Sequence, residues 1–281
     1  MDNSDTNRFS YGISSWCYPW SIGVNKGPQP DKKMTAFELI DKAAAYKVDI
    51  VQIADNLRLE ELSENEISSL REHADKNNIS IEIGTKGFDP VHLLNFLKLA
   101  KELKSPIVRT LPALFGQTAV LEEVERNLIK ILPEFEKAGI ILVLENTETF
   151  KVKDYTDLIE RVNHANFKMC VDLANALGAM EGPEYTMGMF LPYCANYHFK
   201  DIRVIRSQSL MGFTVEGMPA GQGELSLPWA LDKFREQKLK PSIILELWPT
   251  PQETLKETMV LEDRWVKESV DYLKSIDLSY P

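Results

Sequence analysis

Short runs of aliphatic and β-branched residues alternate along this chain with longer amphipathic stretches. Four of the apolar runs share one feature, because each ends at or near a residue that can bind a metal ion. These runs are Ile140–Glu145 (IILVLE), Lys168–Asp172 (KMCVD), Ala195–Lys200 (ANYHFK) and Ser242–Glu246 (SIILE). Apolar runs of this length between turn residues are typical of buried parallel strands.

Four further runs complete the pattern and predict strands at Tyr11–Ser14, Val48–Ile53, Ile79–Gly84 and Pro106–Thr110. The stretches between them predict eight helices. Two begin at Thr35 and Ser63, and five cover residues 90–103, 118–137, 154–164, 183–192 and 226–237. The last runs from Thr250 to Lys274, with Glu253 as its capping acid. Eight strands that alternate with eight helices predict an α/β fold. We expect a single (β/α)8 TIM barrel over residues 1–281, with a loose tail at 1–9.

Two long connections stand out from this pattern. Ser15–Pro30 is rich in Trp, Tyr, Gly and Pro, and Ile202–Gly223 is the longest irregular stretch. Long loops inside a compact domain are usually functional or disordered. Because both follow predicted strands, we expect them to border the C-terminal mouth of the barrel, with Trp16 or Trp20 near the substrate. A purely structural Trp cluster is the alternative.

Composition and charge exclude several classes of partner. With 32 basic against 42 acidic residues the net charge is −10, which disfavours nucleic acid because its binding depends on Lys and Arg. The three cysteines, Cys17, Cys170 and Cys194, are far apart and lack CxxC spacing, which is typical of reduced thiols. No apolar run has the length of a membrane span, and the polar N-terminus does not resemble a signal peptide. These features predict a soluble, cytoplasmic protein; a homo-oligomer stays open.

The polar residues at the four strand ends are Glu145, Asp172, His198 and Glu246. Taken singly, each has a plainer explanation, such as a helix-capping carboxylate or a hydrogen-bonded core histidine. Together they point to one shared partner, because a carboxylate is costly in a sheet interior without one. We therefore expect a divalent cation at the mouth of the barrel. Three carboxylates and an imidazole suit Mn²⁺ or Mg²⁺, with Co²⁺ as a further option, better than zinc.

Such an ion predicts a specific kind of chemistry without an organic cofactor. A cation chelated by a carbonyl and a neighbouring hydroxyl stabilises the enediolate that forms when the intervening carbon loses a proton. Glu145 and Glu246 would act as the catalytic base and acid in an epimerisation or an aldose–ketose isomerisation. A 3-oxo sugar acid that loses CO₂ leaves the same enediolate, so decarboxylation is the alternative.

The sequence resembles the sugar phosphate isomerase/epimerase family with the xylose isomerase-like TIM barrel over nearly its whole length. The resemblance rests on VLEN at 143–146, CVDLAN at 170–175, YHFKD at 197–201, AGQGELSLP at 220–228 and ILELW at 244–248. It implies a divalent metal, commonly manganese, that is bound by Glu145, Asp172, His198 and Glu246, with the two glutamates moving protons. Many members carry a histidine where this chain has Thr147 and Asn175, which puts the substrate in question more than the metal.

The resemblance and the basic residues together narrow the class of substrate that we expect. MGFTVEG at 211–217 resembles a subgroup that decarboxylates 3-oxo sugar acids. Cations near strand ends in an acidic protein suit a phosphate or carboxylate on a carbohydrate, although solvated loop charge is the alternative for each. We expect Lys86 or Arg109 to hold this anion. The expected substrate-binding residues are Trp16, Lys86, Arg109, Asn175, Lys200, Asp201 and Arg203.

Two other classes of protein have a similar pattern. Apurinic endonucleases of the same superfamily need several more histidines than the four of this chain, of which only His198 lies at a predicted strand end. A non-catalytic barrel that binds a metal or a sugar stays open. The sequence thus predicts an enzyme of carbohydrate metabolism, a metal-dependent sugar or sugar phosphate isomerase or epimerase, with the decarboxylase as the alternative.

Overall fold

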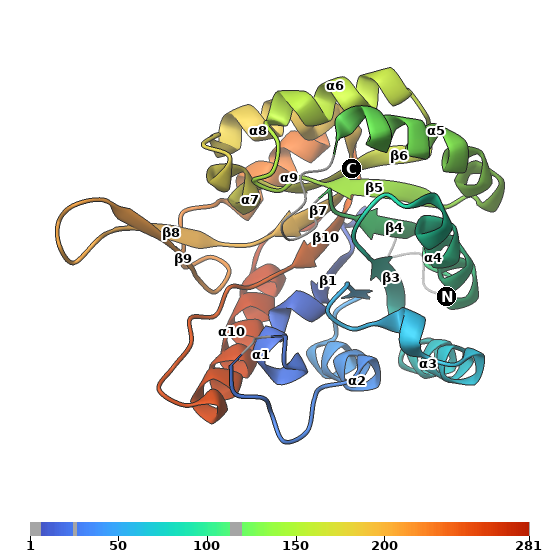
Figure 1. Cartoon of the computed structure of the whole chain (residues 1–281). Helices are drawn as coiled ribbons and strands as arrows, with labels where there is room; N and C mark the ends of the chain where they lie inside the picture. The colour runs from blue at the N-terminus through green and yellow to red at the C-terminus, as the bar shows by residue number, and fades with distance from the viewer. Residues whose placement is uncertain (1–6, 25–26, 113–119, 281) are drawn as a thin grey trace.

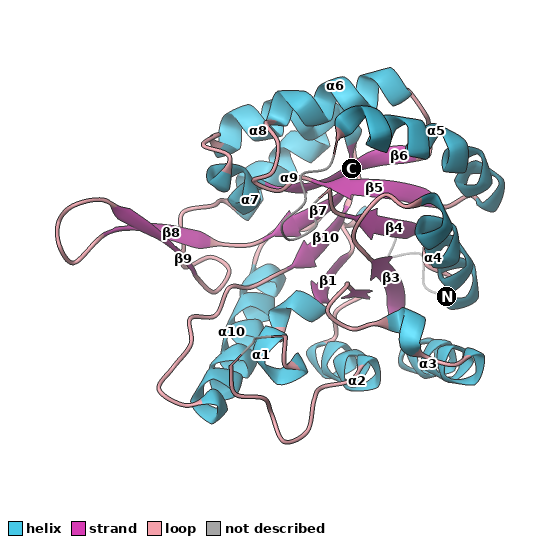
Figure 2. Ribbon diagram, viewed as in Figure 1, coloured by secondary structure: helices cyan, strands magenta, loops and turns pink. Residues whose placement is uncertain are grey.

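Eight parallel strands close into a barrel in the computed structural model, which describes residues 7–24, 27–112 and 120–280 (Figures 1 and 2). The strands are β1 (Tyr11–Ser14), β2 (Ile50–Ile53), β3 (Ser80–Gly84), β4 (Ile107–Thr110), β5 (Ile141–Glu145), β6 (Phe167–Asp172), β7 (Cys194–Phe199) and β10 (Ser242–Leu245). They follow the order β1-β10-β7-β6-β5-β4-β3-β2 around the barrel. The α/β TIM barrel expected from the sequence is confirmed.

Helices surround the barrel (Figure 2). They are α1 (Pro19–Ile22), α2 (Ala36–Tyr46), α3 (Glu64–Asn77), α4 (Pro90–Leu103), α5 (Leu121–Ala138), α6 (Val152–Val162), α7 (Leu173–Gly178), α8 (Pro183–Phe190), α9 (Leu227–Glu236) and α10 (Leu255–Ser275). The capping boxes expected at Thr35 and Ser63 are present. The last helix instead begins at Leu255 and is capped by Thr254 with Glu257, so the start expected at Thr250 is wrong. The start expected at residue 118 lies outside the described residues.

The main hydrophobic core lies between the strands and the helices. Leu39 of α2, Leu70 of α3, Phe96 of α4 and Phe234 of α9 belong to it and are almost completely buried. Ile107, Val143 and Cys170 form a small separate apolar cluster. Because side chains alternate along a strand, Val143 and Cys170 point to the same side as Glu145 and Asp172, so the small cluster lies inside the barrel and the main core outside it.

The barrel interior also holds a hydrogen-bonded polar network. The Gln52 amide donates to Glu82 Oε2 at 3.1 Å, and the Asn196 amide donates to the same oxygen at 3.0 Å and to Ser242 Oγ at 2.7 Å. Because β3 and β7 are not neighbours in the strand order, the contact between Glu82 and Asn196 crosses the interior. We call Gln52, Glu82, Asn196 and Ser242 the lower polar level.

Both long connections differ from the expected irregular loops. The first contains a 3₁₀ turn at Ser15–Cys17 and the short helix α1. The second contains an antiparallel hairpin of β8 (Ile202–Arg206) and β9 (Phe213–Gly217), which projects away from the barrel in Figure 1. Leu210 and Gly212 adopt positive φ between the two strands. We call β8, β9 and this turn the hairpin arm.

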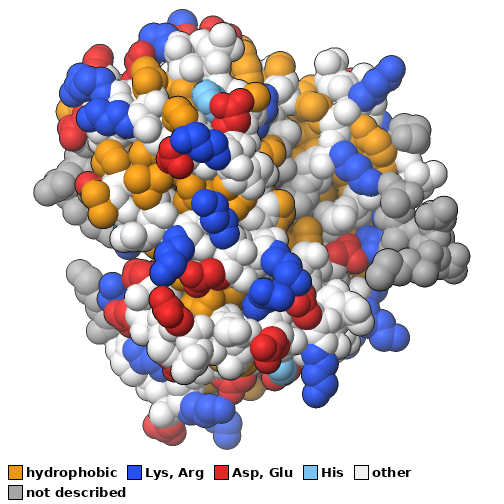
Figure 3. All heavy atoms as spheres, turned by 90° about the vertical axis from the view of Figure 1, so that its right-hand side faces the viewer, with side chains coloured by type: hydrophobic (Ala, Val, Ile, Leu, Met, Phe, Trp, Pro, Cys, Tyr) orange, Lys and Arg blue, Asp and Glu red, His pale blue; other side chains and the backbone are white. Residues whose placement is uncertain are grey.

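Surface charge gives no continuous basic face on the side of the molecule seen in Figure 3, where Lys and Arg side chains are interspersed with Asp and Glu. Among the described residues, every helix is too short or too polar to cross a lipid bilayer.

Candidate metal centre

Four side chains from neighbouring strands meet at the C-terminal end of the barrel. Glu145 ends β5, Asp172 ends β6, His198 lies in β7 and Glu246 directly follows β10. The register pairs Asp172 with His198, which brings the two strands to the same height. One ligand atom from each of the four lies within 4.8 Å of those of the others, and all four residues are buried. We call these residues the acidic–histidine cluster.

Two buried cations hold the carboxylates of this cluster. Lys200 Nζ lies 2.8 Å from Asp172 Oδ2 and 3.1 Å from Glu246 Oε2, beneath the ring of Trp248. The Arg109 guanidinium donates to Glu145 Oε2 and, at 3.2 Å, to Asp55 Oδ1. The cluster is therefore an array of ion pairs, and its geometry is fixed by partners that the linear sequence does not show.

These partners shift the pKa values of the carboxylates in different directions. Burial opposes ionisation of Glu145, yet the Arg109 guanidinium lowers its pKa. Burial likewise opposes ionisation of Glu246, but His198 and Lys200 hold its pKa well below the usual range. Burial dominates at Asp172 and raises its pKa in spite of Lys200. Both glutamates are thus held in the ionised form that a metal ligand needs.

His198 lies between two carboxylates of the cluster, with its Nδ1 3.5 Å from Glu145 Oε2 and 3.4 Å from Glu246 Oε1. Both ring nitrogens are buried, and neither has a hydrogen-bond partner among the described residues. Leaving a buried polar group unsatisfied costs about 1–3 kcal/mol. A metal ion between the imidazole and the carboxylates would remove that cost.

The charge of the site fits the same conclusion. The three carboxylates of the cluster and Asp55 are paired with Arg109, Lys200 and Lys86, which leaves one negative charge when the imidazole is neutral, as a metal ligand must be. Burial opposes protonation of His198, yet the surrounding acidic groups raise its pKa well above the usual range, so a divalent cation would take the place of that proton. The buried acidic and histidine side chains therefore can hold a divalent metal, in an oxygen-rich set that suits a hard ion.

Asn175 and Ser14 position the cluster from either side. The Asn175 amide donates to Glu145 Oε1 at 2.9 Å, and the Asn175 backbone N–H donates to Asp172 Oδ1 at 2.9 Å. The Ser14 hydroxyl donates to Glu246 Oε1 at 3.0 Å. Sequence reasoning missed both Ser14 and Asp55, although each lies at or just after the end of a strand, where a mouth residue is expected.

The remaining expected substrate-binding residues separate into two groups. Trp16 Nε1 donates to Asp55 Oδ1 at 3.3 Å, and Lys86 lies 3.6 Å from Asp55 Oδ2, so both border the cluster. Arg109 is occupied by Glu145 and Asp55, which leaves the half-exposed Lys86 as the better cation for a substrate anion.

Asp201 and Arg203 form hydrogen bonds with the loop at residues 221–225, and their expected role in substrate binding stays a prediction. The Asp201 carboxylate accepts the backbone N–H groups of Gly221, Gly223 and Leu225. A Cβ at residue 223 would lie 2.2 Å from Asp201 Oδ1, so only glycine allows this approach. Arg203 donates to the Gln222 carbonyl from the exposed hairpin arm. The AGQGEL stretch is therefore built around Asp201 as a loop anchor.

Both long connections reach the same end of the barrel. Trp16 contacts Asp55 just after β2, and Gly217 at the end of the hairpin arm packs against Trp248 just after β10. Trp20 lies further along its connection, where its indole donates to the Pro249 carbonyl at 3.3 Å.

The fold is that of the xylose isomerase-like TIM barrel family. The profile of that family matches residues 40–276, and the chain belongs to it.

Individual proteins add detail to the family. The chain is 28% identical over 262 residues to a 3-oxo-isoapionate decarboxylase of Pectobacterium atrosepticum, a match that covers 93% of this chain and 94% of that protein. Among solved structures it resembles the D-psicose 3-epimerase of Clostridium cellulolyticum H10 with D-tagatose, at 15% identity and a TM-score of 0.73 over 95% of this chain and 99% of the other. It also resembles a xylose isomerase-like TIM barrel protein of Mycobacterium smegmatis in complex with magnesium, at 15% identity and a TM-score of 0.65 over 97% and 100% of the two chains. At these identities the structural likeness shows the fold alone.

Proposed function

We propose that this protein is a divalent-metal-dependent decarboxylase that acts on a 3-oxo sugar acid. The full-length similarity to a 3-oxo-isoapionate decarboxylase supports this reaction. The sequence alone favoured isomerisation or epimerisation and kept decarboxylation as the alternative. The ion pairs of the cluster favour decarboxylation over isomerisation and epimerisation.

The metal would be held by Glu145, Asp172, His198 and Glu246, with Mn²⁺, Mg²⁺ or Co²⁺ as the ion that suits these ligands. When bound, it supplies Lewis-acid stabilisation of negative charge on neighbouring substrate oxygens. Asn175 and Ser14 hold the two glutamates in place, and Trp16 and Lys86 border the position of the substrate.

The observation that carries the proposal is that each glutamate is paired with a buried cation. Epimerisation by two carboxylates requires one to take a proton from carbon and the other to return one. A guanidinium on Glu145 and an ammonium 3.1 Å from Glu246 make both weaker bases. Decarboxylation needs no base at this step. The bond between the carboxylate and its carbon breaks, CO₂ leaves, the electron pair passes into the enediolate, and a proton from water then adds to the carbon.

Lys200 has a defined role in this reaction. Its ammonium is buried between Asp172 and Glu246, so it is fixed before the substrate binds. A fixed positive charge beside the developing enediolate stabilises the transition state more than it would in water. The expected substrate is an anionic carbohydrate, whose carboxylate is lost as CO₂ during the reaction.

The test is to incubate the Mn²⁺-loaded protein in D₂O with 3-oxo sugar acids and, separately, with ketoses and sugar phosphates. We expect CO₂ from the sugar acid and little deuterium at the α-carbon of a ketose. Lys200→Met should lower kcat/KM for decarboxylation by about 10–150-fold, which corresponds to the loss of one charged hydrogen bond. Rapid ketose epimerisation with deuterium uptake and no CO₂ from any sugar acid would contradict the proposal.

Epimerisation remains the second candidate because the two glutamates approach the same nitrogen of His198, at 3.5 and 3.4 Å. Two carboxylates that converge on one point from β5 and from the end of β10 are arranged for proton transfer at two faces of a substrate. The deuterium experiment separates this reaction from decarboxylation, because only epimerisation exchanges the α-proton of a ketose.

A further inference from the structure

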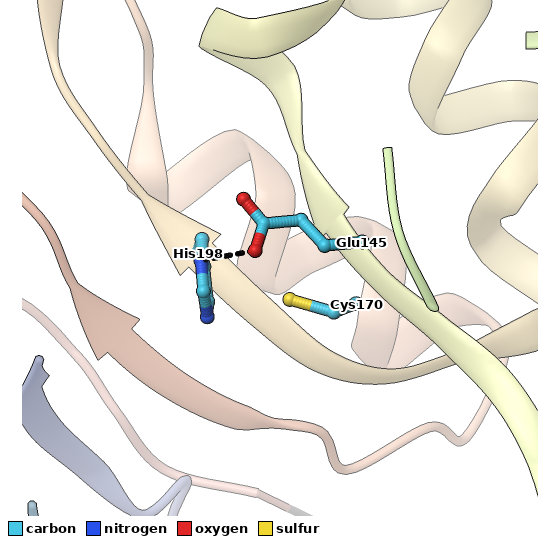
Figure 4. Close-up of side chains that lie close together, drawn as sticks. All are labelled: Glu145, Cys170 and His198. Carbon is cyan, nitrogen blue, oxygen red and sulfur yellow. Dashed lines mark ion pairs between the residues drawn. The ribbon is translucent and has the colours of Figure 1, made fainter. Parts of the chain in front are cut away.

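Cys170 lies directly beneath the acidic–histidine cluster. It precedes Asp172 by two residues in β6, so the two side chains point to the same side of the strand. Its thiol, one carboxylate oxygen of Glu145 and one ring nitrogen of His198 all lie within 4.8 Å of one another (Figure 4). All three residues are buried, and the imidazole has no hydrogen-bond partner.

We propose that Glu145, Cys170 and His198 form a second, softer metal position that overlaps the first and accepts thiophilic ions such as Zn²⁺ and Cd²⁺. The first position offers three carboxylates and an imidazole, whereas the second replaces two carboxylates by a thiolate. Soft sulfur ligands select zinc-like ions, and carboxylates select Mg²⁺ and Mn²⁺. The two positions share Glu145 and His198, so one ion excludes the other.

A metal ion in the second position leaves the carboxylates of the cluster with their present ion-pair and hydrogen-bond partners. Asp172 and Glu246 keep Lys200 between them, at 2.8 and 3.1 Å. Glu145 keeps the Arg109 guanidinium on Oε2 and the Asn175 amide on Oε1 as its orienting partners. An ion on the cysteine side therefore leaves every carboxylate of the cluster with a partner.

When a thiophilic ion binds Cys170, the metal replaces the proton of the thiol. The S–H bond of Cys170 breaks, the sulfur–metal bond forms and the proton leaves to solvent, with no change of oxidation state. Burial raises the pKa of the free thiol to about 12, but a coordinating metal deprotonates a thiol outright. Where the proposed function holds, thiophilic ions would act as inhibitors that compete with the activating metal.

The test uses metal-free full-length protein titrated with Cd²⁺, whose bond to a thiolate gives an ultraviolet charge-transfer band. We expect one band at one equivalent, the release of the thiol proton, and a weaker apparent affinity when Mn²⁺ is present. Cys170→Ser and Cys170→Ala should remove the band. Cys17→Ser and Cys194→Ser are matched controls, because both cysteines are free and buried but lie outside the ligand set, and each should keep it.

Three outcomes would overturn the inference: Cd²⁺ bound by the wild type without a thiolate band, a band that survives in both Cys170 variants, or Cd²⁺ and Mn²⁺ bound together without mutual displacement. Circular dichroism and Mn²⁺ binding establish that the variants are folded. Since the spectrum requires no turnover, a protein that shows the band but releases no CO₂ would overturn the proposed function and leave this inference standing.

Discussion

The lower polar level and the acidic–histidine cluster both place carboxylates inside the barrel, but the partners that stabilise these buried groups differ. In the lower polar level a single carboxylate, Glu82, accepts the amides of Gln52 and Asn196 on one oxygen. Burial raises the pKa of Glu82, and the hydrogen-bond donors around it offset that shift only in part. One uncharged oxygen, Gln52 Oε1, is left without a hydrogen-bond partner.

The acidic–histidine cluster keeps its charges instead. Its carboxylates are held by Lys200 and Arg109, and no described residue forms a hydrogen bond with the ring of His198. The comparison teaches that polarity inside a barrel does not by itself mark a functional site. The distinguishing feature is a group of ionised, cation-paired carboxylates that converges on a buried histidine.

The largest expected difference between the two levels is in activity. Glu246→Gln removes a charged ligand and should lower kcat/KM by roughly 10²–10³-fold, comparable to the loss of one group that stabilises transition-state charge. Glu82→Gln keeps the shape and one acceptor oxygen and should stay within about threefold of the wild type. Steady-state CO₂ release at saturating Mn²⁺ measures both. Equal losses in the two variants would abolish the distinction.

Metal removal should sharpen the comparison through stability. An ion at one hundred times its Kd stabilises the folded state by about 2.7 kcal/mol, so EDTA should lower Tm by several degrees. Glu82→Gln should retain this Tm difference. Asp172→Asn should lose most of it, because the variant lacks one anionic ligand. Differential scanning calorimetry with and without Mn²⁺ decides, and an undiminished shift in Asp172→Asn would show that the ion binds elsewhere.

The smallest effect is a difference in pH dependence of the metal-free protein. The pKa of Glu246 is held below its unfolded value, so its stabilisation is present above about pH 4.5 and is lost as pH falls through the folded pKa. The pKa of Glu82 is raised, so its contribution is present below about pH 4.5 and is lost as pH rises toward the folded pKa.

Relative to Glu246→Gln, the wild type should therefore gain free energy of unfolding with rising pH, and relative to Glu82→Gln it should lose it. Urea unfolding from about pH 3 to pH 8 measures both differences, because the gain from Glu246 occurs below about pH 4.5. Slopes of the same sign would show that the two levels are not electrostatically distinct.

The sequence predicted the barrel and the convergence of the cluster for one physical reason. Parallel strands buried on both faces are continuous apolar runs, and a polar residue that ends such a run must lie at the shared C-terminal edge. Glu145 after four aliphatic residues of β5 is the clearest case. The four ligand atoms follow from that rule without knowledge of the register.

The partners of the cluster could not be predicted in the same way. Arg109 meets Glu145 across neighbouring strands, and only the register pairing Arg109 with Val143 brings their side chains together. Asp201 stands in the right place for a mouth residue, but its oxygens are taken by a loop some twenty residues further on. The hairpin arm was missed because its strands are exposed and show no apolar run.

The hairpin arm and the barrel differ in how firmly their backbone hydrogen bonds are held. β8 and β9 pair only with each other, and Val204, Phe213 and Val215 remain 41%, 64% and 46% exposed. A two-stranded ribbon with so little buried apolar area opens at small cost, whereas β7 is paired on both sides inside the barrel. We therefore expect the backbone amides of β8 to exchange with solvent through local openings and those of β7 to exchange only on unfolding of the barrel. Asp201 lies between the end of β7 and the start of β8, so it marks the expected boundary between the strand that carries His198 and the hairpin arm.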